Sequence, residues 1–161
     1  MIKPINTFPN DQLLRLAEEC KPMEDSLDLE ETPDVWPAEL VELVQDLKDT
    51  LSAGTGIGLA ANQIWDKPEA VPMVFVLKIG DDIVEVINPT LKTTGKPVDV
   101  TEGCLSRPGF FREVRRKQNV EITYQTLGST EKYTTKFYYN VHKIIPIVLQ
   151  HEMDHLLGKV I

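Results

Sequence analysis

The chain has 161 residues, of which 42% are apolar and 26% are charged, as is typical of one folded domain. We therefore expect a single domain over residues 1–161. The net charge of −8 gives no basic surface for nucleic acid or anionic lipid. No apolar run is long enough to cross a bilayer, and the N-terminus lacks the apolar stretch of a signal peptide. Two cysteines do not make a disulfide framework, so a reducing, cytoplasmic setting is expected.

The first part of the chain predicts two helices separated by a loop. Asn10 can cap a short helix that runs to about Cys20. The acidic residues 21–35 include two prolines and predict a surface loop. Residues 36–54 carry apolar side chains at helical spacing, and they predict a second helix that Gly54 ends.

The remainder predicts two β-hairpins and a closing helix. Residues 73–79 and 83–87 are apolar or β-branched and flank a Gly-Asp-Asp turn, which is a hairpin pattern. Residues 120–125 alternate in polarity and precede a second hairpin arm at 131–139. A helix is expected over residues 143–157. This order indicates an α+β fold, with antiparallel sheets around a central helix.

The final helix carries the strongest chemical signal of the chain. His151 and His155 are four residues apart, so they lie on one face of a helix, one turn from each other. Glu152 completes the H-E-x-x-H pattern, in which two imidazoles bind a metal and the glutamate moves protons. The pattern indicates metal-assisted hydrolysis, and it calls for a third ligand, because a catalytic site has three protein ligands and an open position.

The third ligand has to come from upstream, because residues 156–161 contain no suitable side chain. His142 is nine residues from His151 and would face away from it in one helix. Cys20 ends an amphipathic segment, where a cysteine is usually a packing residue. Cys104 remains, and the glycine before it permits a close backbone approach. A thiolate is a strong ligand for zinc or ferrous iron, so we expect Cys104 to complete the site.

A glycine-rich segment over residues 54–63 has no phosphate-loop or dinucleotide pattern, because the required Lys-Ser/Thr pair and preceding strand are missing. Its small residues allow the backbone to lie close to another segment or to a metal site. Gln63 carries an amide that can donate to a developing oxyanion. Taken alone, the segment is more typical of a flexible turn.

Three segments together resemble the three signatures of the peptide deformylase family, in the same order. They are Gly56-Ile57-Gly58-Leu59-Ala60-Ala61-Asn62-Gln63, Glu102-Gly103-Cys104-Leu105-Ser106 and Gln150-His151-Glu152-Met153-Asp154-His155. The resemblance implies a hydrolase that removes the N-formyl group from the formylmethionine of nascent polypeptides and releases formate. It also implies an α+β fold whose antiparallel sheets wrap around the histidine-bearing helix.

The resemblance assigns a role to each matching residue. The implied metal ligands are Cys104, His151 and His155; Glu152 is the implied general base and acid; Gln63 and the Leu105 backbone N–H are the implied oxyanion donors; Ile57, Gly58, Ile147 and Val148 are the implied substrate-binding residues. The implied metal is Fe²⁺, with Zn²⁺, Ni²⁺ or Co²⁺ also accepted. The implied partners are N-formylmethionyl peptides, and a monomer is expected.

Two features depart from the family pattern. Arg107 stands where many members have an apolar residue before proline, so it either alters the rim of the site or is solvated. The chain stops six residues after His155, whereas many bacterial members continue into a helix that docks on the ribosome. The short end resembles phage-encoded members, so we expect a phage origin and a location in the host cytoplasm. Whether the protein docks on the ribosome is left open by the sequence.

Two other functions fit parts of the sequence. A metalloprotease would share the H-E-x-x-H helix, but it takes its third ligand downstream, where this chain has none. A non-enzymatic binder of nascent chains or ribosomes would not need a full set of ligands with Glu152, and this chain retains the full set. Release of formate from a formyl-Met peptide separates the three functions.

Overall fold

The computed structural model describes residues 1–23 and 35–161. The elements in chain order are η1 (Asp11–Leu14), β1 (Ala17–Glu18), α1 (Ala38–Ala53), β2 (Gly58–Ala60), η2 (Ala61–Gln63), β3 (Val71–Pro72), β4 (Val74–Ile79), β5 (Asp82–Cys104), β6 (Arg107–Thr126), β7 (Ser129–Tyr138), α2 (Tyr139–His142) and α3 (Ile145–Leu156). A five-stranded antiparallel sheet has the order β2-β4-β5-β6-β7. Within the described residues, no helix is long and apolar enough to span a bilayer.

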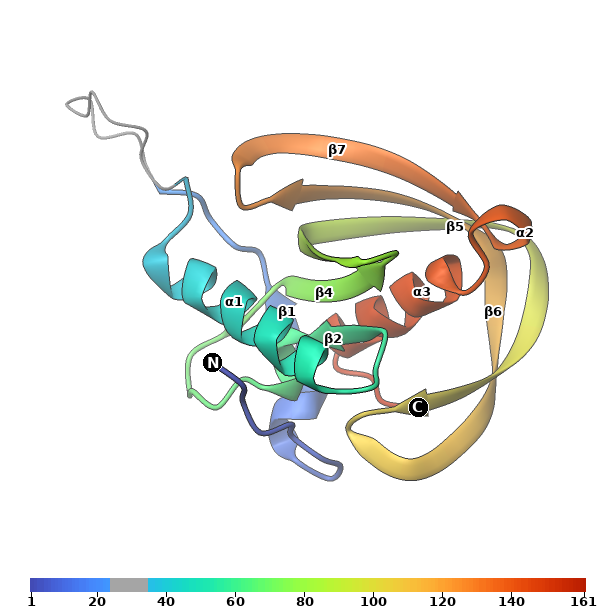
Figure 1. Cartoon of the computed structure of the whole chain (residues 1–161), viewed down its shortest axis with the longest axis horizontal. Helices are drawn as coiled ribbons and strands as arrows, with labels where there is room; N and C mark the ends of the chain where they lie inside the picture. The colour runs from blue at the N-terminus through green and yellow to red at the C-terminus, as the bar shows by residue number, and fades with distance from the viewer. Residues whose placement is uncertain (24–34) are drawn as a thin grey trace.

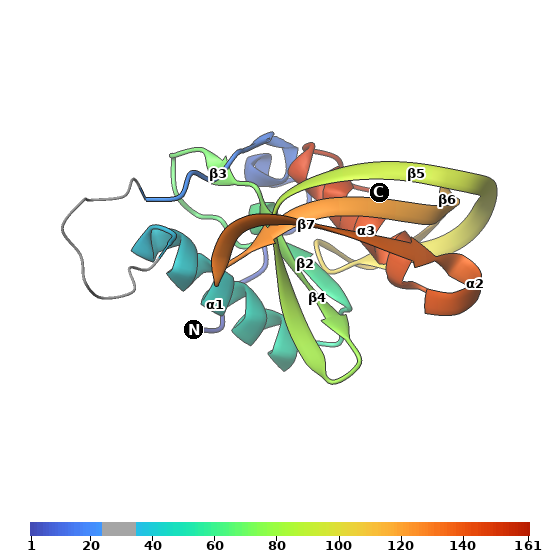
Figure 2. The same cartoon turned by 90° about the horizontal axis from the view of Figure 1, so that it is seen from above.

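Strand β4 lies between the two main helices and explains the layers of the molecule. Val74 and Val76 pack in one apolar cluster with the buried face of α1. Phe75 and Leu77 point the other way, into a second cluster with α3. Alternate side chains of a strand face opposite sides, so a strand covered on both faces reads as a continuous apolar run. Figures 1 and 2 show α1 and α3 on the two sides of β4.

A long ribbon of β5 and β6 curves around α3, and β7 extends it (Figure 1). The sequence predicted only the segments 83–87 and 120–125 of these two strands. The register shifts between Ile87 and Thr90, and again between Thr94 and Pro97. These β-bulges accommodate residues that normally interrupt a strand, and they also bend it. The predicted α+β fold with antiparallel pairing around a central helix is therefore confirmed.

The N-terminal helix prediction was largely wrong. Asn10 does cap a helical turn, by accepting from the backbone N–H of Gln12 at 2.9 Å, but that turn is the short η1. The Asn62 side chain donates a hydrogen bond to the Arg15 backbone carbonyl at 2.8 Å. Strand β1 then pairs with β3 in a small parallel sheet. Segments distant in sequence thus form the backbone hydrogen bonds that would otherwise have been made within a longer helix.

The other helix predictions were accurate within a few residues. Helix α1 begins after Pro37 and ends at Gly54. In α3, Pro146 lies in the first turn, where its missing N–H costs nothing. His142 belongs to the separate helix α2, and its Nδ1 accepts from the Tyr138 backbone N–H at 2.8 Å. The predicted acidic loop at 21–35 lies mostly outside the described residues.

Candidate active site

Three potential metal ligands converge although they come from two distant segments. Cys104 is the last residue of β5, and the two histidines lie one turn apart on α3. The Nε2 atoms of His151 and His155 are 3.2 Å apart, and the Sγ atom of Cys104 is 3.2 Å from Nε2 of His155. All three ligand atoms lie within 4.8 Å of one another. The ribbon around α3 thus brings together the three residues that the sequence predicted.

The geometry and chemistry of these three donors fit a divalent metal ion. Tetrahedral bonds of about 2.0–2.3 Å place ligand atoms about 3.3–3.8 Å apart, close to the spacing seen here. Two imidazoles and one thiolate suit Fe²⁺, Zn²⁺, Co²⁺ or Ni²⁺. Cys20 instead packs beside the apolar core, with its Sγ near the Met73 carbonyl, as a packing residue would.

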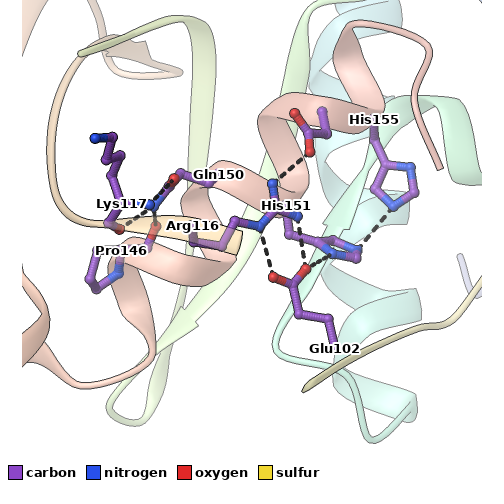
Figure 3. A network of polar contacts seen from close by, with 8 residues as sticks. Glu102, Arg116, Lys117, Pro146, Gln150, His151 and His155 are labelled. Carbon is purple, nitrogen blue, oxygen red and sulfur yellow. Dashed lines mark hydrogen bonds and ion pairs between the residues drawn. The ribbon is translucent and has the colours of Figure 1, made fainter. Parts of the chain in front are cut away.

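A buried ion-pair network contacts the Nδ1 side of the His151 ring (Figure 3). Oε1 of Glu102 is 2.8 Å from Nδ1 of His151. Arg116 donates to both carboxylate oxygens of Glu102, at 2.7 and 2.8 Å, and to Asp154 at 2.6 Å. A carboxylate on Nδ1 keeps the proton there and leaves Nε2 free to bind a metal.

Glu152 is buried beside the histidines, against the glycine-rich segment. Its side chain is 3% exposed, and its Oε2 has no hydrogen-bond partner among the described residues. A Cβ atom at Gly58 would lie only 2.5 Å from its Oε1. Any other residue at position 58 would therefore displace Glu152, which agrees with the expected close approach of this segment to a metal site.

The buried groups of this site have strongly shifted pKa values. Burial raises the pKa of Glu152 to about 7 and lowers the pKa of His155 to about 3. Burial also disfavours charge on Glu102, but hydrogen bonds from Arg116 and His151 outweigh it and lower the Glu102 pKa to about 2. Burial opposes charge on His151, yet Cys104 and Glu102 together raise its pKa to about 10, so a metal ion that binds here displaces a proton from Nε2. These shifts leave one ionised carboxylate, Glu102, and one that is suited to exchange protons near neutral pH, Glu152.

Gln63 lies directly beside the metal-ligand cluster. Its Oε1 accepts from the Ala60 backbone N–H at 2.9 Å, which fixes the orientation of the amide. Its Nε2 lies 3.7 Å from Sγ of Cys104 and 3.1 Å from Oγ of Ser106. The amide therefore faces the cluster, and residues 58–63 form β2 and η2 instead of the flexible turn that was the alternative.

Many of these groups border one cavity of about 600 Å³, although His155 and Arg116 do not. Its lining includes the metal-ligand candidates Cys104 and His151, the general-base candidate Glu152, the oxyanion candidates Gln63 and Leu105, and the substrate candidates Ile57, Gly58, Ile147 and Val148. Arg107 also lines the cavity, with its guanidinium 3.8 Å from the ring centroid of Phe110 and 4.8 Å from that of Phe8. Of the two alternatives for Arg107, the structure supports a place at the rim.

Sequence reasoning missed the residues that support the ligands. Glu102 was noted only as part of a motif, and Arg116 stands in a basic run that looks solvent-exposed. Both side chains are less than a tenth exposed. In a strand with several consecutive basic residues, the sequence does not show which side chain faces the protein interior. That depends on how the strand pairs with its neighbour.

The comparisons with known proteins agree with this geometry. The family model for polypeptide deformylase matches residues 2–161. A peptide deformylase 2 of Nitrosomonas europaea is 35% identical over 122 residues, which cover 76% of this chain and 63% of that protein. The peptide deformylase of Campylobacter jejuni is 32% identical over an alignment covering 98% of this chain and 83% of that one.

A solved structure shows the same fold. The crystal structure of peptide deformylase from Ehrlichia chaffeensis matches with a TM-score of 0.78 and 26% identity, over 99% of this chain and 86% of that one. Together with the cavity and the cluster of Cys104, His151 and His155, these matches show that the chain belongs to the peptide deformylases, the metal-dependent hydrolases that remove the N-formyl group from nascent polypeptides.

Proposed function

We propose that this chain, as one domain over residues 1–161, hydrolyses the formamide bond of N-formylmethionyl peptides in the cytoplasm, with Cys104, His151 and His155 holding the catalytic metal. The convergence of these three ligand atoms within 4.8 Å carries the proposal. The bound ion would act as a Lewis acid and lower the pKa of a coordinated water. We favour Fe²⁺ as the native ion, with Zn²⁺, Ni²⁺ or Co²⁺ able to replace it.

Glu152 is the proposed general base and general acid. The Oε2 atom of this buried side chain has no hydrogen-bond partner in the described part of the chain, so it is free to accept a proton from the attacking water. The same carboxyl then gives the proton to the leaving amine nitrogen as the C–N bond breaks. A pKa raised by burial to about 7 suits both transfers near neutral pH.

Gln63 and the backbone N–H of Leu105 are the proposed donors to the formyl oxygen as it gains negative charge. Gln63 faces the cluster, and Leu105 directly follows Cys104 on the cavity wall. Fixed donors stabilise a developing charge without reorganising, and losing one typically costs about 10²–10³ in rate.

The same cavity offers a place for the peptide. Strand β2 is an outer strand of the sheet, so the backbone at Gly58 can pair with an extended peptide. Ile57 lies on one side, while Ile147 and Val148, both buried on α3, offer an apolar wall for the methionine side chain. We expect a monomer; ribosome docking and phage origin stay predictions from the sequence.

Formate release from formyl-Met-Ala, measured under anaerobic conditions, tests the proposal. We expect formate from this peptide and no cleavage of internal peptide bonds. Glu152→Ala should retain its metal and lose about 10²–10⁴ in rate, the usual contribution of a general base. Near-full turnover by Glu152→Ala would refute the assigned role. Cleavage of internal bonds without formate would favour a metalloprotease, and binding of the peptide without turnover would favour a non-enzymatic binder.

A further inference from the structure

Strand β6 loses a neighbour close to the metal site. Strand β7 pairs with β6 only as far as Asn119, which lies opposite Tyr138 at the end of β7. Lys117 is two residues beyond that point. Backbone groups alternate in direction along a strand, so the N–H and C=O of Lys117 point to the side on which β7 has ended.

The side chain of Gln150 occupies that position. Its Oε1 accepts from the Lys117 N–H at 3.1 Å, and its Nε2 donates to the Lys117 carbonyl at 2.8 Å and to the Pro146 carbonyl at 2.9 Å. Figure 3 shows these contacts between α3 and β6. A carboxamide has two N–H donors, and both are used here. Gln150 is 8% exposed, so it pairs with Lys117 as a neighbouring strand would.

Arg116 and His151, which are next in sequence to Lys117 and Gln150, belong to the metal site. Arg116, before Lys117, holds Glu102, and Glu102 holds His151, which follows Gln150. Cys104 lies on β5, which pairs with β6 along the ribbon. The separation of α3 from β6 therefore sets the separation of the histidines from the thiolate.

We propose that Gln150 is a positioning residue, whose amide fixes α3 against β6 so that Cys104 converges with His151 and His155. Gln150 does not line the cavity formed by the described residues, so it acts through the metal ligands and not on the substrate. This inference rests on the proposed metal site. Removing such a supporting group typically costs about 10–100-fold in metal affinity or activity.

The test uses the Co²⁺-loaded full-length protein, because the visible absorption of Co²⁺ reports its ligand geometry and disappears on release to a chelator. Gln150→Ala should release Co²⁺ about 10–100-fold faster than the wild type, with a shifted absorption band. The KM for formyl-Met-Ala should be unchanged. Gln150→Glu keeps the size and the acceptor but lacks both donors, so it should show the same acceleration; it also serves if Gln150→Ala fails to fold.

Gln125→Ala is the matched control. Gln125 lies on the same strand, is 7% exposed, and hydrogen-bonds Asn88 and the Thr130 carbonyl, neither of which lies on α3. It should release Co²⁺ at the wild-type rate despite a comparable loss of buried hydrogen bonds. The proposal is wrong if the Gln150 variants release Co²⁺ at the wild-type rate, or if Gln125→Ala accelerates release equally. If the wild type takes up no Co²⁺, the proposed metal site itself fails.

Discussion

Adding one methyl group at Gly58 should disable the enzyme without unfolding it. The Cβ atom of Gly58→Ala would lie 2.5 Å from Oε1 of Glu152 and 2.8 Å from its Cδ and Cγ, whereas ordinary contacts begin at 3.4 Å. The Glu152 carboxylate must therefore move away by about 0.9 Å, because a side chain can change its conformation more easily than the backbone at position 58 can shift. Misplacing a reacting group by about 1 Å can cost about 10² in rate. We expect kcat/KM for formyl-Met-Ala to fall about 100-fold.

Equal metal content and a melting curve should accompany the formate assay. Gly128→Ala is the matched control, because a Cβ there meets nothing within 4 Å, and its activity should equal that of the wild type. Combining Gly58→Ala with Glu152→Ala adds a second test, since an alanine at position 152 lacks all three atoms that the methyl group would meet. In that background Gly58→Ala should cost far less than it does alone. Wild-type turnover by Gly58→Ala, or the same loss in both backgrounds, would refute the reasoning.

Three further predictions concern parts of the chain around the site. Arg116→Met leaves Glu102 buried without its cation and should lower the free energy of unfolding of the metal-free protein by about 3–5 kcal/mol in urea; a negligible change would contradict this. Burial raises the pKa of Cys20 to about 11. Because the thiolate is the nucleophile, iodoacetamide at pH 8 should label Cys20 only after unfolding. Rapid labelling of the native protein, detected by mass spectrometry, would contradict this. Arg107 donates to the Ile161 backbone carbonyl, so Arg107→Ile should speed amide hydrogen exchange in residues 157–161, and unchanged exchange would show that this contact does not hold the segment.

The site could be predicted further from the sequence than the fold could. The spacing of His151 and His155 is local, and helical geometry alone places them on one face. Cys104 followed because His142 would face away in one helix and Cys20 is typical of a packing residue. The fold depends instead on pairing between distant segments, such as the strand that replaced the end of the first predicted helix. Local apolar spacing gives no sign that the Arg15 carbonyl will find a partner at Asn62.

The supporting residues show the same limit. Glu102 and Arg116 are ordinary charged residues in sequence, and only their pairing across the β5–β6 ribbon shows that they are buried together. Gln150 likewise gains its role from where β7 ends. Such roles arise from long-range register, which a sequence pattern of period two or 3.6 does not contain.

Anaerobic titration of the metal-free protein with Fe²⁺, followed by formate release from formyl-Met-Ala, tests the central claim most directly. The three-donor site predicts that activity rises linearly and reaches its plateau at about one ion per chain, as expected of one catalytic metal site. Cys104→Ala should give no such plateau. Full formate release by the metal-free wild type, or an unchanged titration of Cys104→Ala, would contradict the assignment of Cys104, His151 and His155 as the catalytic metal centre.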